Sequence, residues 1–114
     1  MDLANRIIVF FAEKTRLVEK IWKELIPQFT EAYKRFSRAL EHFFEEESQF
    51  YAEFVKRSQK HLEKGKSARE KIEKKEVVGL SRNTLEGVER DLTEATEGLN
   101  QLSDEMEEYD QMSL

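Results

Sequence analysis

The sequence contains no cysteine, a single proline and four glycines among its 114 residues. The absence of cysteine excludes disulfides and thiolate metal sites. Proline and glycine are the residues that most often interrupt helices, and both are scarce here, while charged residues reach 38%. Such a composition is typical of long helices and coiled coils, so we predict an all-α fold in one domain that spans residues 1–114.

Long hydrophobic runs are also missing. The longest run, residues 7–12, ends at Glu13 and Lys14. It falls well short of the roughly 18 apolar residues that cross a bilayer, and its flanks do not fit a signal peptide. We therefore expect a soluble, cytoplasmic protein, with peripheral attachment to a membrane as the alternative.

Negative charge dominates only one part of the chain. The net charge is −5, yet residues 1–75 carry 17 Lys/Arg and 13 Asp/Glu, whereas residues 76–114 carry 2 and 11. Opposite charges on the two segments favour their association. The acidic total argues against binding to nucleic acid.

What the chain does have is a regular aromatic stripe. Every seventh residue from position 22 to position 50 is aromatic, and aliphatic residues fill a second position of the same repeat. This periodicity predicts a helix with one apolar face, and we extend the helix over residues 2–75, with Asp2 capping its first turn. The aromatic positions are Trp22, Phe29, Phe36, Phe43 and Phe50, and the second set is Val18, Leu25, Ala32 and Ala39.

Pro27 lies inside that predicted helix. A proline there removes one backbone hydrogen bond and bends the axis. Alternatively, Pro27 opens a second helix after a turn, and residues 3–26 fold back on residues 28–54. The seven-residue step from Trp22 to Phe29 is intact, and no Gly, Asn or Ser flanks the proline, which favours a kinked but continuous helix.

A second helix is predicted over residues 83–111, followed by a tail at 112–114. Its apolar residues alternate three and four apart, which is the pattern of a coiled-coil seam. Residues 76–82 form the preceding turn, where Gly79 takes the left-handed conformation that ends a helix. Asn83, with Glu86 three residues on, caps the second helix, and Ser81 is the alternative cap. The predicted seam consists of Leu85, Val88, Leu92, Ala95, Leu99, Leu102 and Met106.

The lengths of the two helices predict self-association. At 1.5 Å per residue the second helix spans about 40 Å and the first about 110 Å, so a hairpin that places Leu85 opposite Ile72 and Leu99 opposite Phe54 leaves the aromatic half uncovered. A soluble monomer does not expose such a stripe, so we expect an antiparallel homodimer, assembled as a multi-chain helical bundle. The predicted dimer interface consists of Phe11, Val18, Trp22, Leu25, Phe29, Ala32 and Phe36.

No motif for catalysis or cofactor binding is found. Residues 65–67, Gly-Lys-Ser, echo the end of a phosphate-binding loop, but Lys60 stands where the loop requires its first glycine. His42 and His61 lack the glutamate three residues earlier that a four-helix di-iron site uses. The glutamates at 45–47 are typical of a solvated helix face. We predict no enzymatic activity, no cofactor and no metal.

A basic segment follows the aromatic half. We expect its side chains to pair internally with Glu86, Glu89, Asp91 and Glu94 of the second helix. The alternative is contact with anionic lipid headgroups, where each basic residue contributes about 1 kcal/mol. The residues concerned are Lys56, Lys60, Lys64, Lys66, Arg69, Lys71, Lys74 and Lys75.

In outline, long helices, a proline kink, an antiparallel dimer and basic patches resemble the membrane-bending BAR and F-BAR family. The resemblance is architectural and rests on no sequence motif. It implies only that a rigid, curved dimer could present basic residues to a membrane. The sequence thus predicts a scaffold or dimerisation module that binds a second copy of itself or other helical proteins, with membrane-surface binding as the alternative.

Overall fold

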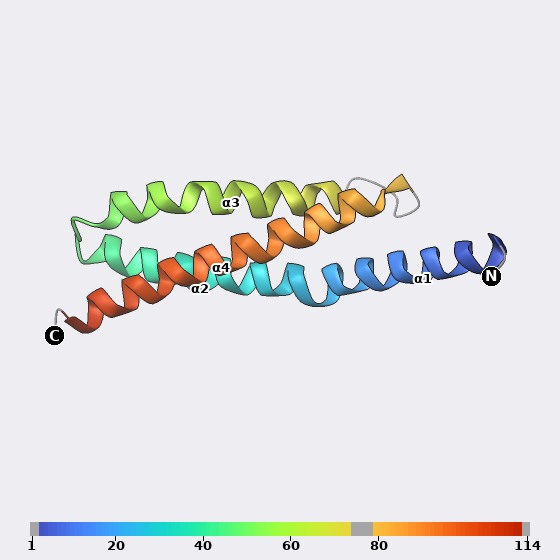
Figure 1. Cartoon of the computed structure of the whole chain (residues 1–114). Coiled ribbons are helices and arrows are strands. Elements are labelled where there is room, and N and C mark those ends of the chain that lie inside the picture. The colour runs from blue at the N-terminus through green and yellow to red at the C-terminus, as the bar shows by residue number, and fades with distance from the viewer. Residues whose placement is uncertain (1–2, 74–78, 113–114) are drawn as a thin grey trace.

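The computed structural model describes residues 3–73 and 79–112, and these are almost entirely helical. In chain order the elements are α1 (Leu3–Lys20), the short π-helix η1 (Ile21–Leu25), α2 (Ile26–Glu45), α3 (Tyr51–Glu73) and α4 (Arg82–Met112). No strand occurs in this part of the chain, and the body measures 66 × 22 × 16 Å. The predicted all-α, elongated fold is confirmed (Figure 1).

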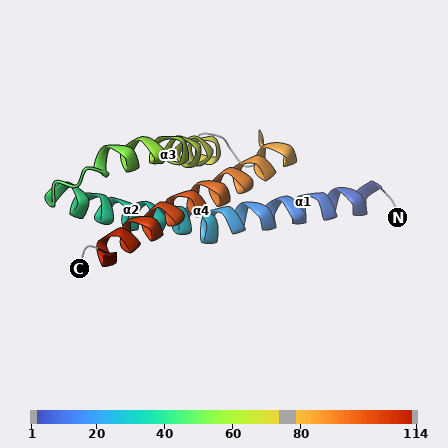
Figure 2. The ribbon, with the colours of Figure 1, turned by 60° about the vertical axis from the view of Figure 1, so that its left-hand side comes forward.

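Three rods lie side by side along this body. The first consists of α1, η1 and α2, which follow one another without a break. α3 returns antiparallel to that rod, and α4 runs in the same direction as α1 and α2 (Figures 1 and 2). α4 packs against both α2 and α3, whereas α1 extends past it, so the two ends of the chain lie at opposite ends of the body (Figure 1).

The predicted unbroken helix over residues 2–75 is wrong at residues 46–50. There the chain leaves α2, reverses direction and enters α3. Helix ends of this kind usually carry Gly or Asn, but here Glu47 takes that place, with a left-handed φ of 53°. The sequence therefore lacks the usual signal for the end of α2.

Backbone hydrogen bonds define this turn. The N–H groups of Glu47 and Ser48 donate to the carbonyls of Phe44 and Phe43, each at 3.0 Å, which is the pair of bonds of a Schellman motif. The Ser48 hydroxyl then accepts a hydrogen bond from the Phe50 N–H at 3.2 Å. Because Ser48 helps to close one helix and to cap the next, the reversal is short.

The chain passes Pro27 as helix, because a π-helical turn precedes it. The Ile26 N–H donates to the carbonyl of Ile21, five residues earlier, and Leu25 and Ile26 keep right-handed helical dihedrals. In an α-helix a proline ring clashes with the carbonyl four residues before it, and the wider turn relieves that contact. Helix, rather than a turn, therefore surrounds Pro27.

The π-helix also moves Trp22 out of the aromatic stripe. Each residue of a π-helix advances by a smaller angle than in an α-helix, because the hydrogen bonds span five residues rather than four. Trp22 is consequently 42% exposed, whereas Phe29 and Phe36 are 4% and 2% exposed. Ile21 takes the inward position next to Trp22 and is fully buried.

Three further aromatics of the stripe are buried within this one chain, and Phe50 is partly buried against the core. Because α3 folds back along α2, Phe29, Phe36 and Phe43 lie in the core, and the rings of Phe43 and Phe54 meet edge to face with centroids 5.6 Å apart. The length argument for a dimer fails for these residues, since it treated residues 28–75 as one straight rod. Their burial does not require a second copy.

α4 supplies the other side of the core. Its start differs from the prediction in two details: Ser81, not Asn83, accepts the capping bond, from the Thr84 N–H at 3.1 Å, and Gly79 does not have a positive φ. Asp2, the end of the predicted first helix at residues 74–75 and residues 76–78 of the predicted turn lie outside the described residues. The seven predicted seam residues are at most 3% exposed: Leu85, Val88, Leu92, Ala95, Leu99, Leu102 and Met106.

The alignment of α4 with α3 is shifted from the predicted one. The ring of Tyr109, not Leu99, faces Phe54, with 6.2 Å between ring centroids. His61 lies against Gly98.

α4 follows the first rod in parallel at a nearly constant offset. Three ion pairs each join residues 69 positions apart, and a contact at the far end joins residues 68 apart. They are Glu13–Arg82, Lys20–Glu89, Arg35–Asp104 and His42–Asp110.

Candidate interaction surface

The N-terminal half of α1 exposes several large hydrophobic side chains close together. We call residues 3–11 the apolar end of α1. Its six large hydrophobic side chains are between 43% and 73% exposed, and the rings of Phe10 and Phe11 lie edge to face with centroids 5.9 Å apart. Contiguous exposed surface of this kind marks interaction sites. The side chains are Leu3, Ile7, Ile8, Val9, Phe10 and Phe11.

The position of α4 explains why this segment is uncovered. α4 begins at Arg82, whose guanidinium lies 3.4 Å from the Glu13 carboxylate, so the apolar end of α1 continues beyond it (Figure 1). Residues 7–12 are apolar without a break and therefore place apolar side chains on every side of the helix. A helix of that kind is normally surrounded by other elements.

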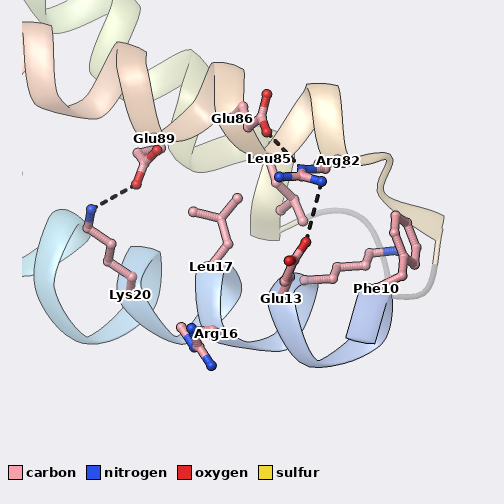
Figure 3. Close-up of a pocket in the computed structure, with 10 residues that line it drawn as sticks. Phe10, Glu13, Arg16, Leu17, Lys20, Arg82, Leu85, Glu86 and Glu89 are labelled. Carbon is pink, nitrogen blue, oxygen red and sulfur yellow. Dashed lines mark hydrogen bonds and ion pairs between the residues drawn. The ribbon is translucent and has the colours of Figure 1, made fainter. Parts of the chain in front are cut away.

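A groove of about 270 Å³ lies between the C-terminal half of α1 and the start of α4, next to the apolar end of α1 (Figure 3). Phe10, Leu17 and Leu85 provide its apolar lining. Leu85 is fully buried, so the groove reaches down to the core. Phe10 thus belongs both to the apolar end of α1 and to the lining of this groove.

Charged residues of both signs surround the groove. Arg82 lies between Glu13 at 3.4 Å and Glu86 at 3.0 Å. Lys20 donates to Glu89 at 2.9 Å, and this hydrogen bond raises the pKa of Lys20 (Figure 3). A rim of mixed charge suits a protein helix better than it suits a polyanion.

The structure separates the residues of the predicted dimer interface. Phe11 and Trp22 are 52% and 42% exposed. The exposed apolar surface lies nearer the N-terminus than predicted and includes side chains that the heptad repeat omits, such as Ile8. The unbroken run at 7–12 is the sequence signal for them. The remaining predicted interface residues are at most 9% exposed in the single chain: Val18, Leu25, Phe29, Ala32 and Phe36.

α3 carries the predicted basic segment, and part of it is used within the chain. Lys64 pairs with Glu94 at 2.8 Å, which raises the pKa of Lys64 and lowers that of Glu94. Arg69 pairs with Glu73 of its own helix at 2.7 Å. Lys66 lies over the ring of Tyr33, 5.8 Å from its centroid.

The remaining described basic residues of the segment face solvent. Lys56, Lys60 and Lys71 are exposed, and no ion pair holds them in the part of the chain that the structure describes. Lys74 and Lys75 lie outside that part. Three of the predicted acidic partners pair elsewhere: Glu86 with Arg82, Glu89 with Lys20 and Asp91 with Arg90.

Arg35 makes the densest polar contact between α2 and α4. Its Nη2 lies 2.6 Å from Asp104 and 2.9 Å from Glu107, and its Nε donates to the second Glu107 oxygen at 3.1 Å. Its Nη1 donates to Asn100 at 3.2 Å. Hydrogen bonds to Glu107 and then Asp104 raise the pKa of Arg35.

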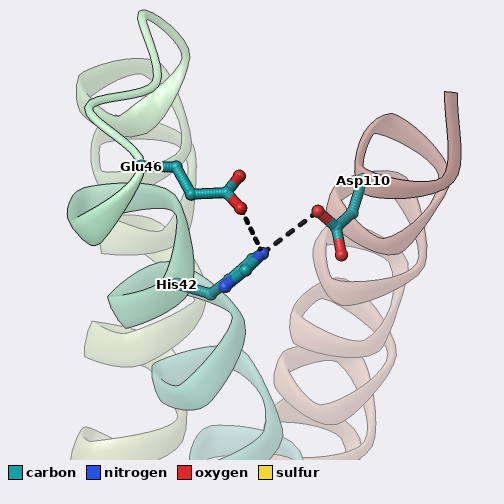
Figure 4. A group of neighbouring side chains, drawn as sticks. All are labelled: His42, Glu46 and Asp110. Carbon is teal, nitrogen blue, oxygen red and sulfur yellow. Dashed lines mark hydrogen bonds and ion pairs between the residues drawn. The ribbon is translucent and has the colours of Figure 1, made fainter. Parts of the chain in front are cut away.

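The two histidines occupy opposite electrostatic environments. The Nε2 of His42 lies 3.0 Å from Asp110 and 3.1 Å from Glu46 (Figure 4), and the hydrogen bond to Asp110, with the charge of Glu46, raises the pKa of His42. Burial lowers the pKa of His61, and the nearby charges, Lys60 first, lower it further. The spacing of His42 and Glu46 was visible in the sequence, but Asp110 is brought to them by the fold alone.

None of the described helices has the length and apolar character needed to cross a membrane. No protein-family model matches the chain, and no curated protein or solved structure is significantly similar to it, so its function has to be argued from its own surfaces.

Proposed function

We propose that the protein is a non-enzymatic helical module that associates with a second copy of itself through the apolar end of α1. The exposure of six large hydrophobic side chains on one protruding helix supports this proposal. Burying such a side chain contributes about 1.5–3 kcal/mol. The gain from covering several of them is large enough to drive association.

Charge favours a second copy as the partner. If two apolar ends pack antiparallel about a two-fold axis between Val9 and Phe10, Arg6 of each copy comes level with Glu13 of the other. Arg6 is exposed, and the Glu13 side chain is 49% exposed. The symmetric pairing therefore brings two pairs of opposite charges together at the rim of an apolar contact. A helix of another protein is the alternative occupant.

Sedimentation equilibrium at micromolar concentration tests the proposal. Wild type should have twice the mass of the 13.6 kDa chain. Ile8→Glu combined with Phe11→Glu should give a monomer with unchanged helical circular dichroism, because both side chains are more than half exposed in the single chain.

A matched control is available at the other end of the body. Phe44 is 64% exposed, so Phe44→Glu places a negative charge at an exposed aromatic without touching α1, and it should leave the mass unchanged. A wild-type mass of one chain would reject self-association. If the dimer persists in the variant with Ile8→Glu and Phe11→Glu but is lost in Phe44→Glu, the interface lies at the opposite end of the body.

A second candidate function is binding to an anionic membrane surface through α3. Lys56, Lys60 and Lys71 favour it, because they are exposed and have no ion-pair partner among the described residues, and each basic residue near such a surface contributes about 1 kcal/mol. Co-sedimentation with phosphatidylserine vesicles tests it. Binding should fall with added salt and with Lys56→Glu, Lys60→Glu and Lys71→Glu combined.

The vesicle assay also distinguishes binding through α3 from insertion of the apolar end of α1. If Ile8→Glu with Phe11→Glu abolishes vesicle binding while the lysine variant does not, the apolar end of α1 inserts into the membrane and α3 plays no part. If neither charged nor neutral vesicles bind wild type, the membrane function is excluded.

A further inference from the structure

Three metal-ligating side chains converge where α2 and α4 end (Figure 4). The His42 Nε2 lies 3.0 Å from the Asp110 Oδ1 and 3.1 Å from the Glu46 Oε1, and one ligand atom from each residue lies within 4.8 Å of the other two. Two carboxylates thus face one ring nitrogen, which has at most one proton to donate. From this geometry we propose that His42, Glu46 and Asp110 bind Zn²⁺.

The fold supplies the three ligands from two elements. His42 and Glu46 are four residues apart, so they lie on the same side of α2 and its C-cap. Asp110 belongs to α4 and reaches them because α4 runs parallel to α2 with its last turns at the same end of the body (Figure 4). A bound ion would therefore join two segments that are 68 residues apart in sequence.

The distances fit a small, tetrahedral ion. Zn²⁺ binds imidazole nitrogen and carboxylate oxygen at about 2.0–2.2 Å, so neighbouring ligand atoms around it are about 3.4 Å apart. The nitrogen–oxygen distances here are 3.0 and 3.1 Å. If both nitrogen–oxygen distances lengthened by a few tenths of an ångström, the ion would fit in the place of the shared proton, with water as the fourth ligand.

The donor set selects a transition metal rather than Mg²⁺ or Ca²⁺. One imidazole and two carboxylates suit Zn²⁺, whereas Ca²⁺ takes six to eight oxygen ligands and Mg²⁺ prefers an octahedron of oxygens. The three side chains are 46%, 55% and 48% exposed. An open site of this kind should bind at micromolar rather than nanomolar concentration.

Calorimetric titration of chelator-treated protein with ZnCl₂ tests the proposal. Wild type should show one saturable site per chain, and Zn²⁺ should raise its melting temperature. His42→Gln and Asp110→Asn should each weaken binding at least tenfold and remove the melting shift. MgCl₂ should neither bind nor compete.

Matched variants distinguish this site from general attraction to the acidic surface. His61→Gln removes the other histidine and Glu45→Gln removes a neighbouring carboxylate, and both should leave affinity unchanged. Circular dichroism should confirm that all variants remain helical, since the ligands are exposed. Absence of saturable binding, binding unchanged by His42→Gln, or one Zn²⁺ per two chains would each overturn the proposal.

Discussion

The ring of Phe29 occupies the space beside Gly65 that a side chain would need. A Cβ built on Gly65 would overlap Cε2 and Cζ of Phe29, so α2 and α3 lie in direct contact there. Gly98 of α4 and the imidazole of His61 repeat this arrangement. Glycines that weaken an isolated helix thus allow three helices to pack closely.

Replacing Gly65 with alanine should destabilise the protein by about 1–3 kcal/mol, because the added methyl overpacks a well-filled contact. Gly87→Ala is the matched control. A Cβ there meets only the Nη2 of Arg90, at 3.9 Å, so the better helix propensity of alanine should add about 0.5–1 kcal/mol. Urea unfolding measures both, and a gain for Gly65→Ala would show that Phe29 does not pack against it.

The turn at 46–50 carries strain that one substitution should relieve. Glu47 has a left-handed φ of 53°, which is about 1–2 kcal/mol less stable for a residue with a Cβ. Glu47→Gly should therefore raise the free energy of unfolding by about 1 kcal/mol. Glu45→Gly, in the last turn of α2, should lower it by about 0.5–1 kcal/mol. Equal losses for both variants would mean that Glu47 does not have the left-handed conformation that follows α2.

Two aromatics of the same heptad repeat should behave differently. Phe36 is 2% exposed and Trp22 is 42% exposed. Phe36→Ala should cost about 3–5 kcal/mol, the usual loss for a buried aromatic, and Trp22→Ala much less. Chemical unfolding followed by circular dichroism compares them directly. Similar losses for the two variants would mean that Trp22 lies on the same buried face as Phe36 and that the π-helix does not displace it.

His61 should make stability depend on pH in a defined direction. Its pKa is lowered from the ordinary 6.5, first by burial and then by the charge of Lys60, so the unfolded chain takes up the proton first as pH falls. The stability that His61 contributes is present above pH 6.5 and is lost as pH falls through the window below it.

His42 works in the opposite direction, because its pKa is raised, so its contribution is present below pH 6.5 and is lost as pH rises through its folded pKa. The test compares the free energy of unfolding of His42→Gln with that of the double variant His42→Gln, His61→Gln. Measured between about pH 5 and 8 in the presence of a chelator, the difference isolates the effect of His61. The double variant should lose less stability on acidification. Parallel pH profiles would show that His61 is not desolvated.

Much of the helical structure could be predicted from spacing alone. The three-and-four alternation from Leu85 to Met106 corresponds to one buried face of α4, because such a face depends only on the regular geometry of a helix. Two errors arose where the backbone leaves that geometry: Glu47 in a conformation typical of glycine, and Trp22 inside a π-helix. Neither is encoded by the hydrophobic pattern.

The candidate surfaces could be predicted less well, and for a related reason. The apolar run at 7–12 is visible in the sequence, but its exposure depends on where α4 begins, which in turn follows from the reversal at 46–50. Asp110 likewise meets His42 only because α4 is parallel to α2. Contacts between residues 68 positions apart require the topology before they can be inferred.

The constant offset between α4 and the first rod has a consequence for how the chain selects a single alignment. A seam of residues three and four apart nearly superimposes on itself after a slip of seven positions, so hydrophobic burial hardly distinguishes one register from the next. Arg35, with Asp104, Glu107 and Asn100 around it, finds this set of partners in one register only. Exposed ion pairs contribute little to the free energy of unfolding. Here their effect is to favour one register of α4 over the registers that differ from it by seven residues.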